Sequence, residues 1–457
     1  MENKYDIIVL GAGLTGLTTS YYIHKSGKKV LVIDPNSHVG GVIQTDAKNG
    51  FLFEKGPNTG ILGSVEIAEL IEDLHPDCEI EVGNKIVDKR FILHNAKWQP
   101  LPAGLSQGVT TPLFSFKDKL RLLGEPFRKP GTNDNETLAE LVKRRMGQSF
   151  LDYAIDPFIL GVYAGDPSYL VPKYALPKLY NLEQDYGSFI GGAIKKKFIK
   201  TSERDKKATR KIFTIKGGLS KLADAIYKRI GEEKFILGAT NIEVGKLDKG
   251  YSVKLFNANK EPLEFQSDKI ITTTPAFQLE NLLPFVEKDL IKDVQNVFYA
   301  PVVEVAIGFN KWEGVSLDGF GGLIPHKEKR DILGVMYMSS LFEGRAPEGG
   351  ALISVFVGGA RRPELTKLSD EKIKKLVEKE FKELMGVENF NPDLFEISHH
   401  NRAIPQYGKE SKERFAAVKS IQKEYPGLFI GGNLYDGIGM ADRVKQGKQM
   451  ADFVINN

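Results

Sequence analysis

The fold is decided by residues 6–16, which read Asp-Ile-Ile-Val-Leu-Gly-Ala-Gly-Leu-Thr-Gly. This stretch runs from an apolar strand into a glycine-rich turn, and the residues after it have the apolar spacing of a helix. Gly11 permits the tight turn, Gly13 lets the backbone approach a pyrophosphate, and Gly16 lets the helix pack closely on the strand. The free N–H groups at the start of the helix then point at the phosphates. We therefore expect a dinucleotide to bind here.

A second strand supports this expectation. Residues 29–33 read Lys-Val-Leu-Val-Ile and lead directly to Asp34. An acid at this distance from the glycine turn binds the ribose hydroxyls in dinucleotide-binding folds. The complete setting favours a dinucleotide site over an ordinary βαβ unit with a chance glycine turn.

Composition limits the class of protein. A chain of 457 residues is long enough for two or three domains. Its net charge of +4 gives no reason to expect a nucleic-acid partner. The one cysteine, Cys78, excludes an intrachain disulfide and the paired redox cysteines of disulfide reductases. We expect no metal, because His, Cys and acidic residues do not cluster at ligand spacing, and a cytoplasmic location, because the sequence has no signal core or membrane-spanning apolar run.

Two further glycine-rich segments select the dinucleotide. Residues 38–45 read His-Val-Gly-Gly-Val-Ile-Gln-Thr and give a second paired-glycine turn just past the ribose-binding acid. Residues 425–440 read Tyr-Pro-Gly-Leu-Phe-Ile-Gly-Gly-Asn-Leu-Tyr-Asp-Gly-Ile-Gly-Met, the pattern of a strand, a glycine turn and a helix start. A site closed by this C-terminal segment fits a flavin better than a dissociable nicotinamide. We therefore expect FAD.

These motifs resemble the flavin amine oxidase/phytoene desaturase superfamily. Three segments are similar to its oxygen-dependent protoporphyrinogen oxidases: residues 156–166 (Asp-Pro-Phe-Ile-Leu-Gly-Val-Tyr-Ala-Gly-Asp), 216–222 (Lys-Gly-Gly-Leu-Ser-Lys-Leu) and 403–407 (Ala-Ile-Pro-Gln-Tyr). Residues 319–325 and 339–347 also match that family. The matching segments follow the family's order over nearly the whole chain.

The resemblance implies an α/β fold with three domains, two of which are discontinuous. A Rossmann-like FAD-binding domain would comprise residues 1–85, 212–285 and 405–457. Residues 86–102 and 286–404 would form a mixed-sheet substrate-binding domain. An inserted helical, membrane-facing domain would comprise residues 103–211. A homodimer is expected because relatives form one.

One FAD is expected per chain. We expect it to be non-covalent, because Cys78 lies far from the C-terminal region where related amine oxidases carry a flavin-linking cysteine. The motifs and the resemblance together place the following residues at the cofactor: Gly11, Ala12, Gly13, Leu14, Thr15, Gly16, Asp34, Gly40, Gly41, Val42, Ile43, Gln44, Gly56, Pro57, Asn58, Ile242, Asn433, Gly437, Ile438, Gly439 and Met440. Some relatives have an arginine where this chain has Gln44.

The resemblance also proposes the substrate site. Arg90 matches the family's propionate-binding arginine, and a guanidinium suits a carboxylate through its bidentate fork. Gly161 matches the position whose backbone carbonyl faces the pyrrole N–H groups. Leu323, Leu333 and Phe356 match the apolar residues on either side of the macrocycle, although taken alone they read as ordinary core residues. Asn58 is a further candidate contact to the flavin or the substrate.

The implied reaction is the oxidation of protoporphyrinogen IX to protoporphyrin IX by oxygen in haem biosynthesis. It takes three two-electron steps and releases hydrogen peroxide. Because the flavin accepts the hydride, no catalytic triad is expected. Coproporphyrinogen III oxidation, another amine oxidase or desaturase activity, and a non-catalytic porphyrin carrier are the alternatives.

Two segments leave alternatives open. The basic run Lys195–Lys211 is either a solvated loop or a docking site for acidic lipids or an anionic substrate. Residues 105–123 mix apolar side chains with Lys117, Lys119 and Arg121, which suits either a peripheral contact with the inner membrane or a buried helix.

Overall fold

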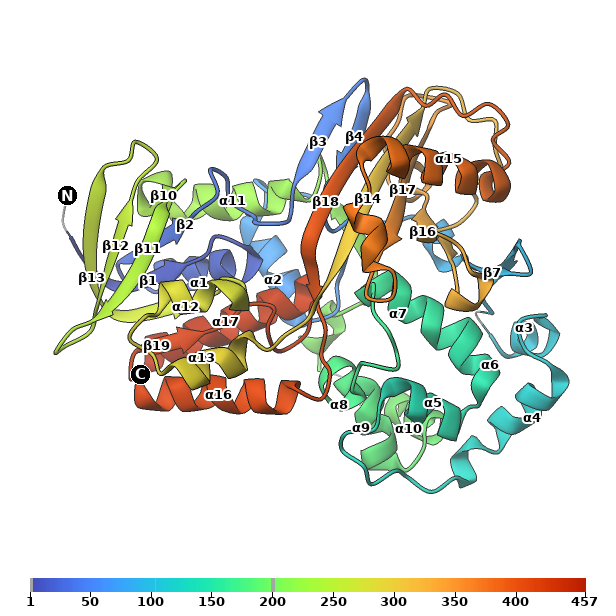
Figure 1. Cartoon of the computed structure of the whole chain (residues 1–457), viewed down its shortest axis with the longest axis horizontal. Coiled ribbons are helices and arrows are strands. Elements are labelled where there is room, and N and C mark those ends of the chain that lie inside the picture. Colours follow the sequence, from blue (N-terminus) through green and yellow to red (C-terminus); the bar gives the residue numbers. More distant parts are fainter. Residues whose placement is uncertain (1–2, 103, 199–201) are drawn as a thin grey trace.

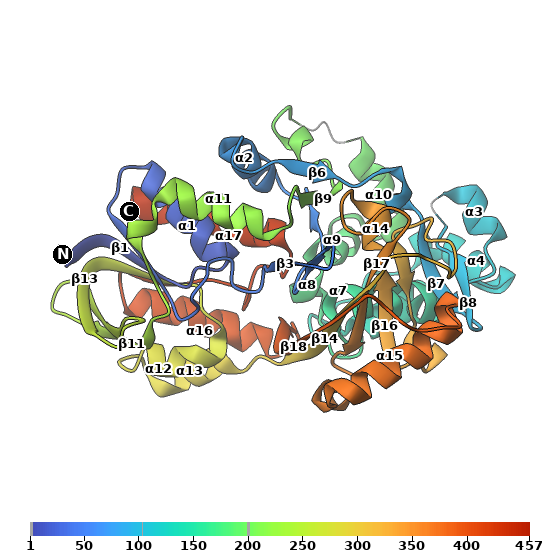
Figure 2. The same ribbon diagram turned by 90° about the horizontal axis from the view of Figure 1, so that it is seen from above.

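The computed structural model describes residues 3–102, 104–198 and 202–457. Figure 1 shows two large sheets side by side and a group of helices below the second sheet. Both termini lie at the far end of the first sheet, as Figure 2 shows from above.

The first sheet has the strand order β10-β2-β1-β13-β12-β11, with β19 also paired to β13. Its strands are β1 (Lys4–Leu10), β2 (Val30–Asp34), β10 (Phe235–Leu237), β11 (Thr240–Lys246), β12 (Tyr251–Phe256), β13 (Pro262–Thr272) and β19 (Leu428–Ile430). The strands β10, β2, β1, β13 and β19 run parallel, whereas β12 and β11 form an antiparallel edge. Parallel strands are covered on both faces, which explains why β1 and β2 read as unbroken apolar runs.

Helices cover both faces of this sheet. One apolar cluster joins it to α1 (Leu14–Lys25), α2 (Val65–Leu74), α11 (Ser220–Ile230) and α17 (Met440–Asn456). A second cluster on the other face includes α12 (Leu279–Leu282), α13 (Lys288–Gln295) and α16 (Ser411–Glu424). The chain turns at Gly238, between β10 and β11, where φ is +70°, and these two strands lie at opposite edges of the sheet.

The second sheet has the strand order β18-β14-β17-β16-β15-β7-β8. Its strands are β7 (Arg90–His94), β8 (Lys97–Pro100), β14 (Tyr299–Phe309), β15 (Gly321–Leu323), β16 (Ile332–Met336), β17 (Ala351–Gly358) and β18 (Leu394–Pro405). The sheet is mixed as predicted, since β7 and β15 pair in parallel and the other pairs are antiparallel. Helix α15 (Asp370–Met385) packs on one face, and the other face is left for α7 and the cofactor-proximal segments.

Short elements complete the α/β part. Two small sheets pair β3 (Thr45–Lys48) with β4 (Phe51–Glu54), and β5 (Gly60–Ile61) with β9 (Ile212–Ile215) and β6 (Ile80–Val82). Helix α14 (Met338–Leu341) follows β16. The predicted domain boundaries stay a prediction.

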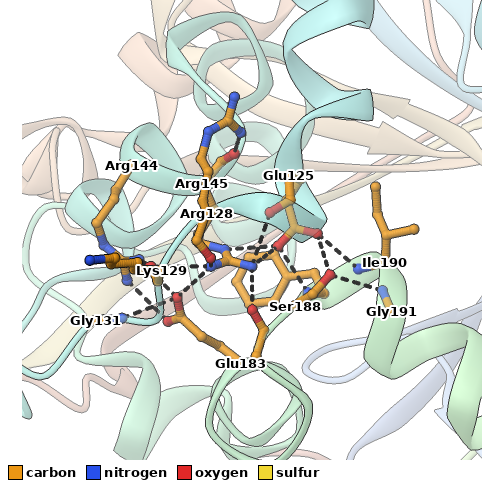
Figure 3. A network of polar contacts seen from close by, with 12 residues as sticks. Glu125, Arg128, Lys129, Gly131, Arg144, Arg145, Glu183, Ser188, Ile190 and Gly191 are labelled. Carbon is orange, nitrogen blue, oxygen red and sulfur yellow. Dashed lines mark hydrogen bonds and ion pairs between the residues drawn. The ribbon is translucent and has the colours of Figure 1, made fainter.

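Residues between β8 and β9 are helical. The helices are α3 (Leu105–Thr110), α4 (Phe116–Leu123), α5 (Leu138–Arg145), α6 (Gln148–Phe150), α7 (Asp156–Tyr163), α8 (Pro172–Ala175), α9 (Pro177–Tyr186) and α10 (Phe189–Lys197). A buried polar network holds several of them together (Figure 3). In it, the fully buried Arg145 pairs with Glu125, whose carboxylate also accepts hydrogen bonds from Ser188 Oγ and the N–H groups of Phe189 and Ile190.

Part of the basic run is neutralised within the protein. Arg204 and Lys207 pair with Glu69 and Glu72 of α2. Residues 199–201 of the run, and the side chain of Lys197, lie outside the described residues. Throughout the described part of the chain, no helix is both long enough and apolar enough to cross a bilayer.

Candidate active site

The first glycine turn joins β1 to α1 as the sequence predicts. Gly11 has a φ of +109°, and Gly16 lies so close to the turn that an added Cβ would come within 1.9 Å of Gly11 O. Gly13 differs from both, because a Cβ there would meet no protein atom within 4 Å. The space in front of Gly13 and the first turn of α1 is therefore open to a ligand.

The second glycine turn lies directly against the first. Gly40 N–H donates to Ala12 O at 2.8 Å, and Gly13 and Gly40 form a parallel bridge. A Cβ on Gly41 would lie 3.4 Å from Gly13 Cα. The two turns, 27 residues apart in sequence, thus form one glycine-lined cradle.

Asp34 lies at the end of β2 beside this cradle. Its buried carboxylate accepts hydrogen bonds from Ala12 N–H at 2.6 Å and from Asn36 N–H at 2.7 Å. Burial raises the pKa of Asp34, and these two hydrogen bonds partly offset the rise. Ala239 N–H donates to Asp34 O, so β11 with the half-buried Ile242 begins beside Asp34.

The C-terminal glycine segment reaches the same place. Gly431 N–H donates to Thr272 O at the end of β13, and helix α17 packs on α1 at Gly447, where a Cβ would lie 2.7 Å from Thr15 O. The chain ends of β1, β13 and β19 therefore lie together under residues 431–440, which include the predicted contacts Asn433, Gly437, Ile438, Gly439 and Met440.

Three buried side chains that sequence reasoning missed hold this segment. Tyr407 Oη donates to Asn433 O at 2.7 Å and to Gly437 O at 2.9 Å. Arg414 donates to Leu434 O, and Arg443 donates to Gly432 O and Tyr435 O. Burial lowers the pKa of both guanidinium groups. In the sequence, these three residues are indicated only by the tyrosine that ends the segment 403–407 and by two arginines in segments with the apolar spacing of a helix.

The residues present fit a dinucleotide. Besides the open space at Gly13, no described residue hydrogen-bonds the buried Thr15 Oγ1 in the first turn of α1, and a ligand oxygen would satisfy it. Some predicted contacts have side chains in the core, so that only their backbone faces the ligand; these are Leu14, Ile43 and Met440. Val42 is 63% exposed. Gln44 Nε2 bonds His38 Nε2 and Gly41 O, so this side chain braces the second turn.

The Gly-Pro-Asn turn at residues 56–58 links the cradle to the second sheet. A Cβ on Gly56 would lie 2.0 Å from Val42 O, which fixes the close approach of this turn to the second glycine segment. Asn58 is buried, and its amide is fully used: Nδ2 donates to Glu304 Oε1 at 2.6 Å, and Oδ1 accepts from Ser354 Oγ at 2.7 Å. Asn58 therefore positions the turn through the sheet rather than offering a free amide to a ligand.

The predicted apolar substrate residues come together between α7 and the second sheet. Leu333 and Phe356 share a cluster with Leu160 and Ala164 at the end of α7. A Cβ on Gly161 would lie 2.3 Å from Leu323 Cδ2, so only glycine allows this contact. Gly161 is also in the last turn of α7, where carbonyl groups lack intrahelical partners and are free to accept from a ligand.

Arg90 lies at the edge of the same face. Arg90 of β7 pairs with Gly321 of β15. Two residues further along these strands, Ile92 pairs with Leu323. The Arg90 guanidinium lies 5.1 Å from the Phe320 ring centroid, and no acidic side chain of the described residues pairs with it. Burial lowers the pKa of this group and the charge of Asp88 partly offsets the fall, so burial is a cost that a bound anion would relieve.

Comparison with known proteins agrees with this geometry. The model of the "Flavin containing amine oxidoreductase" family matches residues 14–455. Protoporphyrinogen oxidase 2 of Arabidopsis thaliana is 29% identical over 98% of this chain and 94% of its own length. The chloroplastic protoporphyrinogen oxidase of Oryza sativa is 30% identical over 98% of this chain and 88% of its own length. The coproporphyrinogen III oxidase of Bacillus subtilis is 27% identical over 98% of this chain and 97% of its own length.

Solved structures share the fold. A candidate protoporphyrinogen oxidase from Exiguobacterium superposes with a TM-score of 0.81 at 20% identity, and the two chains cover 99% of each other. A putrescine oxidase has a TM-score of 0.72 at 14% identity, with full coverage of both chains. The protein is thus an oxidoreductase whose cofactor is FAD. The chain belongs to the flavin-containing amine oxidoreductase family, and within it to the branch of the protoporphyrinogen and coproporphyrinogen III oxidases.

Proposed function

We propose that this chain oxidises protoporphyrinogen IX to protoporphyrin IX in haem biosynthesis, with oxygen as the final acceptor of the electrons. The observation that carries the proposal is Arg90, a half-buried cation without an acidic partner among the described residues. It borders an apolar face closed by Gly161 and Leu323. A flat, largely apolar molecule with carboxylates at one edge suits such a site.

The chain's own residues bind and orient the substrate. When bound, FAD supplies the chemistry, since it accepts a hydride from a saturated carbon and passes the electrons to oxygen. Arg90 binds a propionate through its bidentate fork. The carbonyl of Gly161 accepts from pyrrole N–H groups, while Leu333 and Phe356 exclude water from the oxidised carbon.

Coproporphyrinogen III is the second candidate substrate, favoured by the relative from Bacillus subtilis. Coproporphyrinogen III carries four propionates and protoporphyrinogen IX two, so the former calls for more cations on the substrate face. The predicted pocket offers Arg90 among leucines and a phenylalanine, which favours protoporphyrinogen IX. Turnover of both substrates, followed by porphyrin fluorescence, tests the choice. A higher kcat/KM for coproporphyrinogen III would reverse it.

Replacing Arg90 by alanine should raise the KM for either porphyrinogen about 10- to 100-fold with FAD still bound. A hydrogen bond to a charged group contributes about 1.5–3 kcal/mol, and each ~1.4 kcal/mol is tenfold in affinity. The neighbouring Lys89 is exposed and pairs with Asp318, so Lys89→Ala is the matched control and should leave the KM unchanged. Steady-state kinetics check this, and an unchanged KM in Arg90→Ala would remove Arg90 from the site.

An amine oxidase and a non-catalytic porphyrin carrier would differ from the proposed enzyme in the behaviour of the flavin. We propose that FAD is non-covalent, because Cys78 is buried in the core between α2 and the first sheet. Acid precipitation should therefore release all yellow colour from the protein. A carrier that kept FAD only for structure would not be bleached by porphyrinogen.

We also propose a peripheral membrane contact at the helical region. Phe116, Leu120 and Leu123 lie on one face of α4, all more than half exposed, and Phe127 follows at 89% exposure. Lysine and arginine side chains alternate with them, as suits an anionic bilayer surface. Phe127→Ser should lower the affinity for anionic vesicles, measured by co-sedimentation, about tenfold, because burying a Phe side chain contributes ~1.5–3 kcal/mol.

The matched control for this contact is Phe453, which is 57% exposed on α17, away from the helical region. Phe453→Ser should sediment with the vesicles as the wild type does. Equal loss in both variants, or wild-type protein that stays in the supernatant, would contradict the membrane contact.

A further inference from the structure

Glu304 is a titratable group of the substrate face to which the proposed reaction has so far given no role. Alternate residues of β14 pack in the cluster under α15, among them Val303 and Val305. Glu304 therefore points to the opposite face, as side chains alternate along a strand. Across the sheet, Glu304 pairs with Phe356 of β17. Phe356 pairs in turn with Gly334 of β16, and Gly334 pairs with Leu323 of β15. One row of residues thus joins the Glu304 carboxyl to the apolar substrate site.

The carboxyl group is isolated from cations. Glu304 is 3% exposed, and no basic side chain of the described residues forms an ion pair with it. Oε1 accepts from Asn58 Nδ2, and Ser354 fixes the orientation of that amide. No described residue hydrogen-bonds Oε2. One oxygen is therefore anchored to the cofactor-proximal turn, and the other is left to exchange a proton with a bound molecule.

Glu54 and His400 are the titratable groups nearest Glu304 on this face, and no described residue hydrogen-bonds the buried Nε2 of His400. Glu54 of β4 forms a buried pair with Arg345. His400 lies on the same face of β18 as Ser398, the residue opposite Glu304, and Lys55 contacts it. Burial, and to a smaller extent the charge of Glu54, raise the pKa of Glu304 to about 8, while the hydrogen bond from Asn58 lowers it. A group with this pKa exchanges protons efficiently near neutral pH.

We propose that Glu304 accepts the proton that each two-electron oxidation of the bound porphyrinogen releases; this rests on the proposed function. In each step a C–H bond of a methylene bridge breaks and its electron pair leaves with the hydride to FAD. In two of the three steps a pyrrole N–H bond breaks as well, and its electron pair forms the new C=N double bond. In the remaining step the proton comes from the last methylene bridge, whose C–H electron pair forms a C=C double bond, so that four C–H and two N–H bonds break in all. The proton moves to Glu304 Oε2, and solvent takes it before the next step. Oxygen, reduced to hydrogen peroxide, is the final oxidant.

Two consequences follow for the rate. Only ionised Glu304 accepts a proton, so kcat should rise about tenfold per pH unit below pH 8 and level off above it. Glu304→Gln keeps the acceptor oxygen for Asn58 but cannot take the proton. This variant should lose about 100-fold or more in kcat, and the limb of the pH profile near pH 8 should disappear.

Glu380 provides the matched control. It is a second buried glutamate of raised pKa, on α15 behind the same sheet, where it pairs with Arg330 and accepts a hydrogen bond from Asp331 N–H. Glu380→Gln should keep both the rate and the pH limb. Glu304→Asp should keep the limb at a reduced rate, which separates loss of the carboxyl group from loss of packing.

A measurement without substrate completes the test. In FAD-loaded protein, the infrared band of a protonated carboxyl group should titrate near pH 8 in the wild type and in Glu380→Gln, and be missing in Glu304→Gln. Wild-type turnover with an unaltered rate and pH limb in Glu304→Gln, or an infrared band that this substitution leaves in place, would overturn the proposal. A wild type that oxidises no porphyrinogen would overturn the proposed function and this step with it.

Discussion

Replacing Gly13 by alanine should leave the protein folded and remove its FAD. Gly13 precedes α1 with φ −73° and ψ 175°, a conformation that alanine adopts without strain. An added Cβ would meet no protein atom within 4 Å and would project into the space in front of the first turn of α1. We expect the Kd for FAD to rise about 100-fold, equivalent to roughly 2.7 kcal/mol, by fluorescence titration of the apoprotein. The Tm of the apoprotein should stay unchanged.

Gly16 is the control for this prediction. A Cβ at Gly16 would lie 1.9 Å from Gly11 O, so α1 must move off the sheet before alanine fits. Gly16→Ala should therefore lower the Tm of the apoprotein itself, whereas Gly13→Ala should not. Wild-type FAD affinity in Gly13→Ala would show that the cofactor's pyrophosphate does not pass this turn.

The second large effect is expected in the helical region. Arg145→Met should lower the free energy of unfolding by about 3–5 kcal/mol, because it leaves the Glu125 carboxylate buried without its counter-ion. Both side chains of this pair are fully buried. Despite the opposing effect of burial, hydrogen bonds from Ser188, Phe189 and Arg145 hold the pKa of Glu125 below its ordinary value. Denaturant unfolding measured by circular dichroism checks the prediction.

The pair Lys173–Asp134 is the matched control in the same region. Both of its side chains are solvent-accessible, and exposed ion pairs contribute about 0–1 kcal/mol. Lys173→Met should therefore change stability by less than ~1 kcal/mol. Equal losses in the two variants would mean that the network in Figure 3 does not hold the helices together.

The sequence predicts local elements of this fold well, and the reasons are physical. The βαβ unit at the N-terminus has strong apolar periodicity, and it is present where expected. The segment 235–244 is harder to interpret, because apolar residues continue across Gly238, where the backbone turns to the opposite edge of the sheet. Periodicity reports burial, and both pieces are partly buried.

The site is less accessible to sequence reasoning because it is built from distant segments. Local patterns indicate the glycine turns, but only the fold brings the second turn and Gly447 against the first. Arg90 and Gly161 were found through a family resemblance, not through their own chemistry. Glu304 was missed altogether, since a lone acid in an apolar strand gives no sign of which residues lie opposite it.

The central claim is that a porphyrinogen bound on the substrate face reduces the FAD held by the glycine cradle. Anaerobic mixing of the FAD-loaded protein with excess protoporphyrinogen IX in a stopped-flow spectrophotometer tests it directly. We expect complete bleaching of the flavin absorbance, with porphyrin fluorescence appearing at the same time and the yellow colour returning when oxygen is admitted. Flavin absorbance that stays unchanged with both protoporphyrinogen IX and coproporphyrinogen III would contradict it.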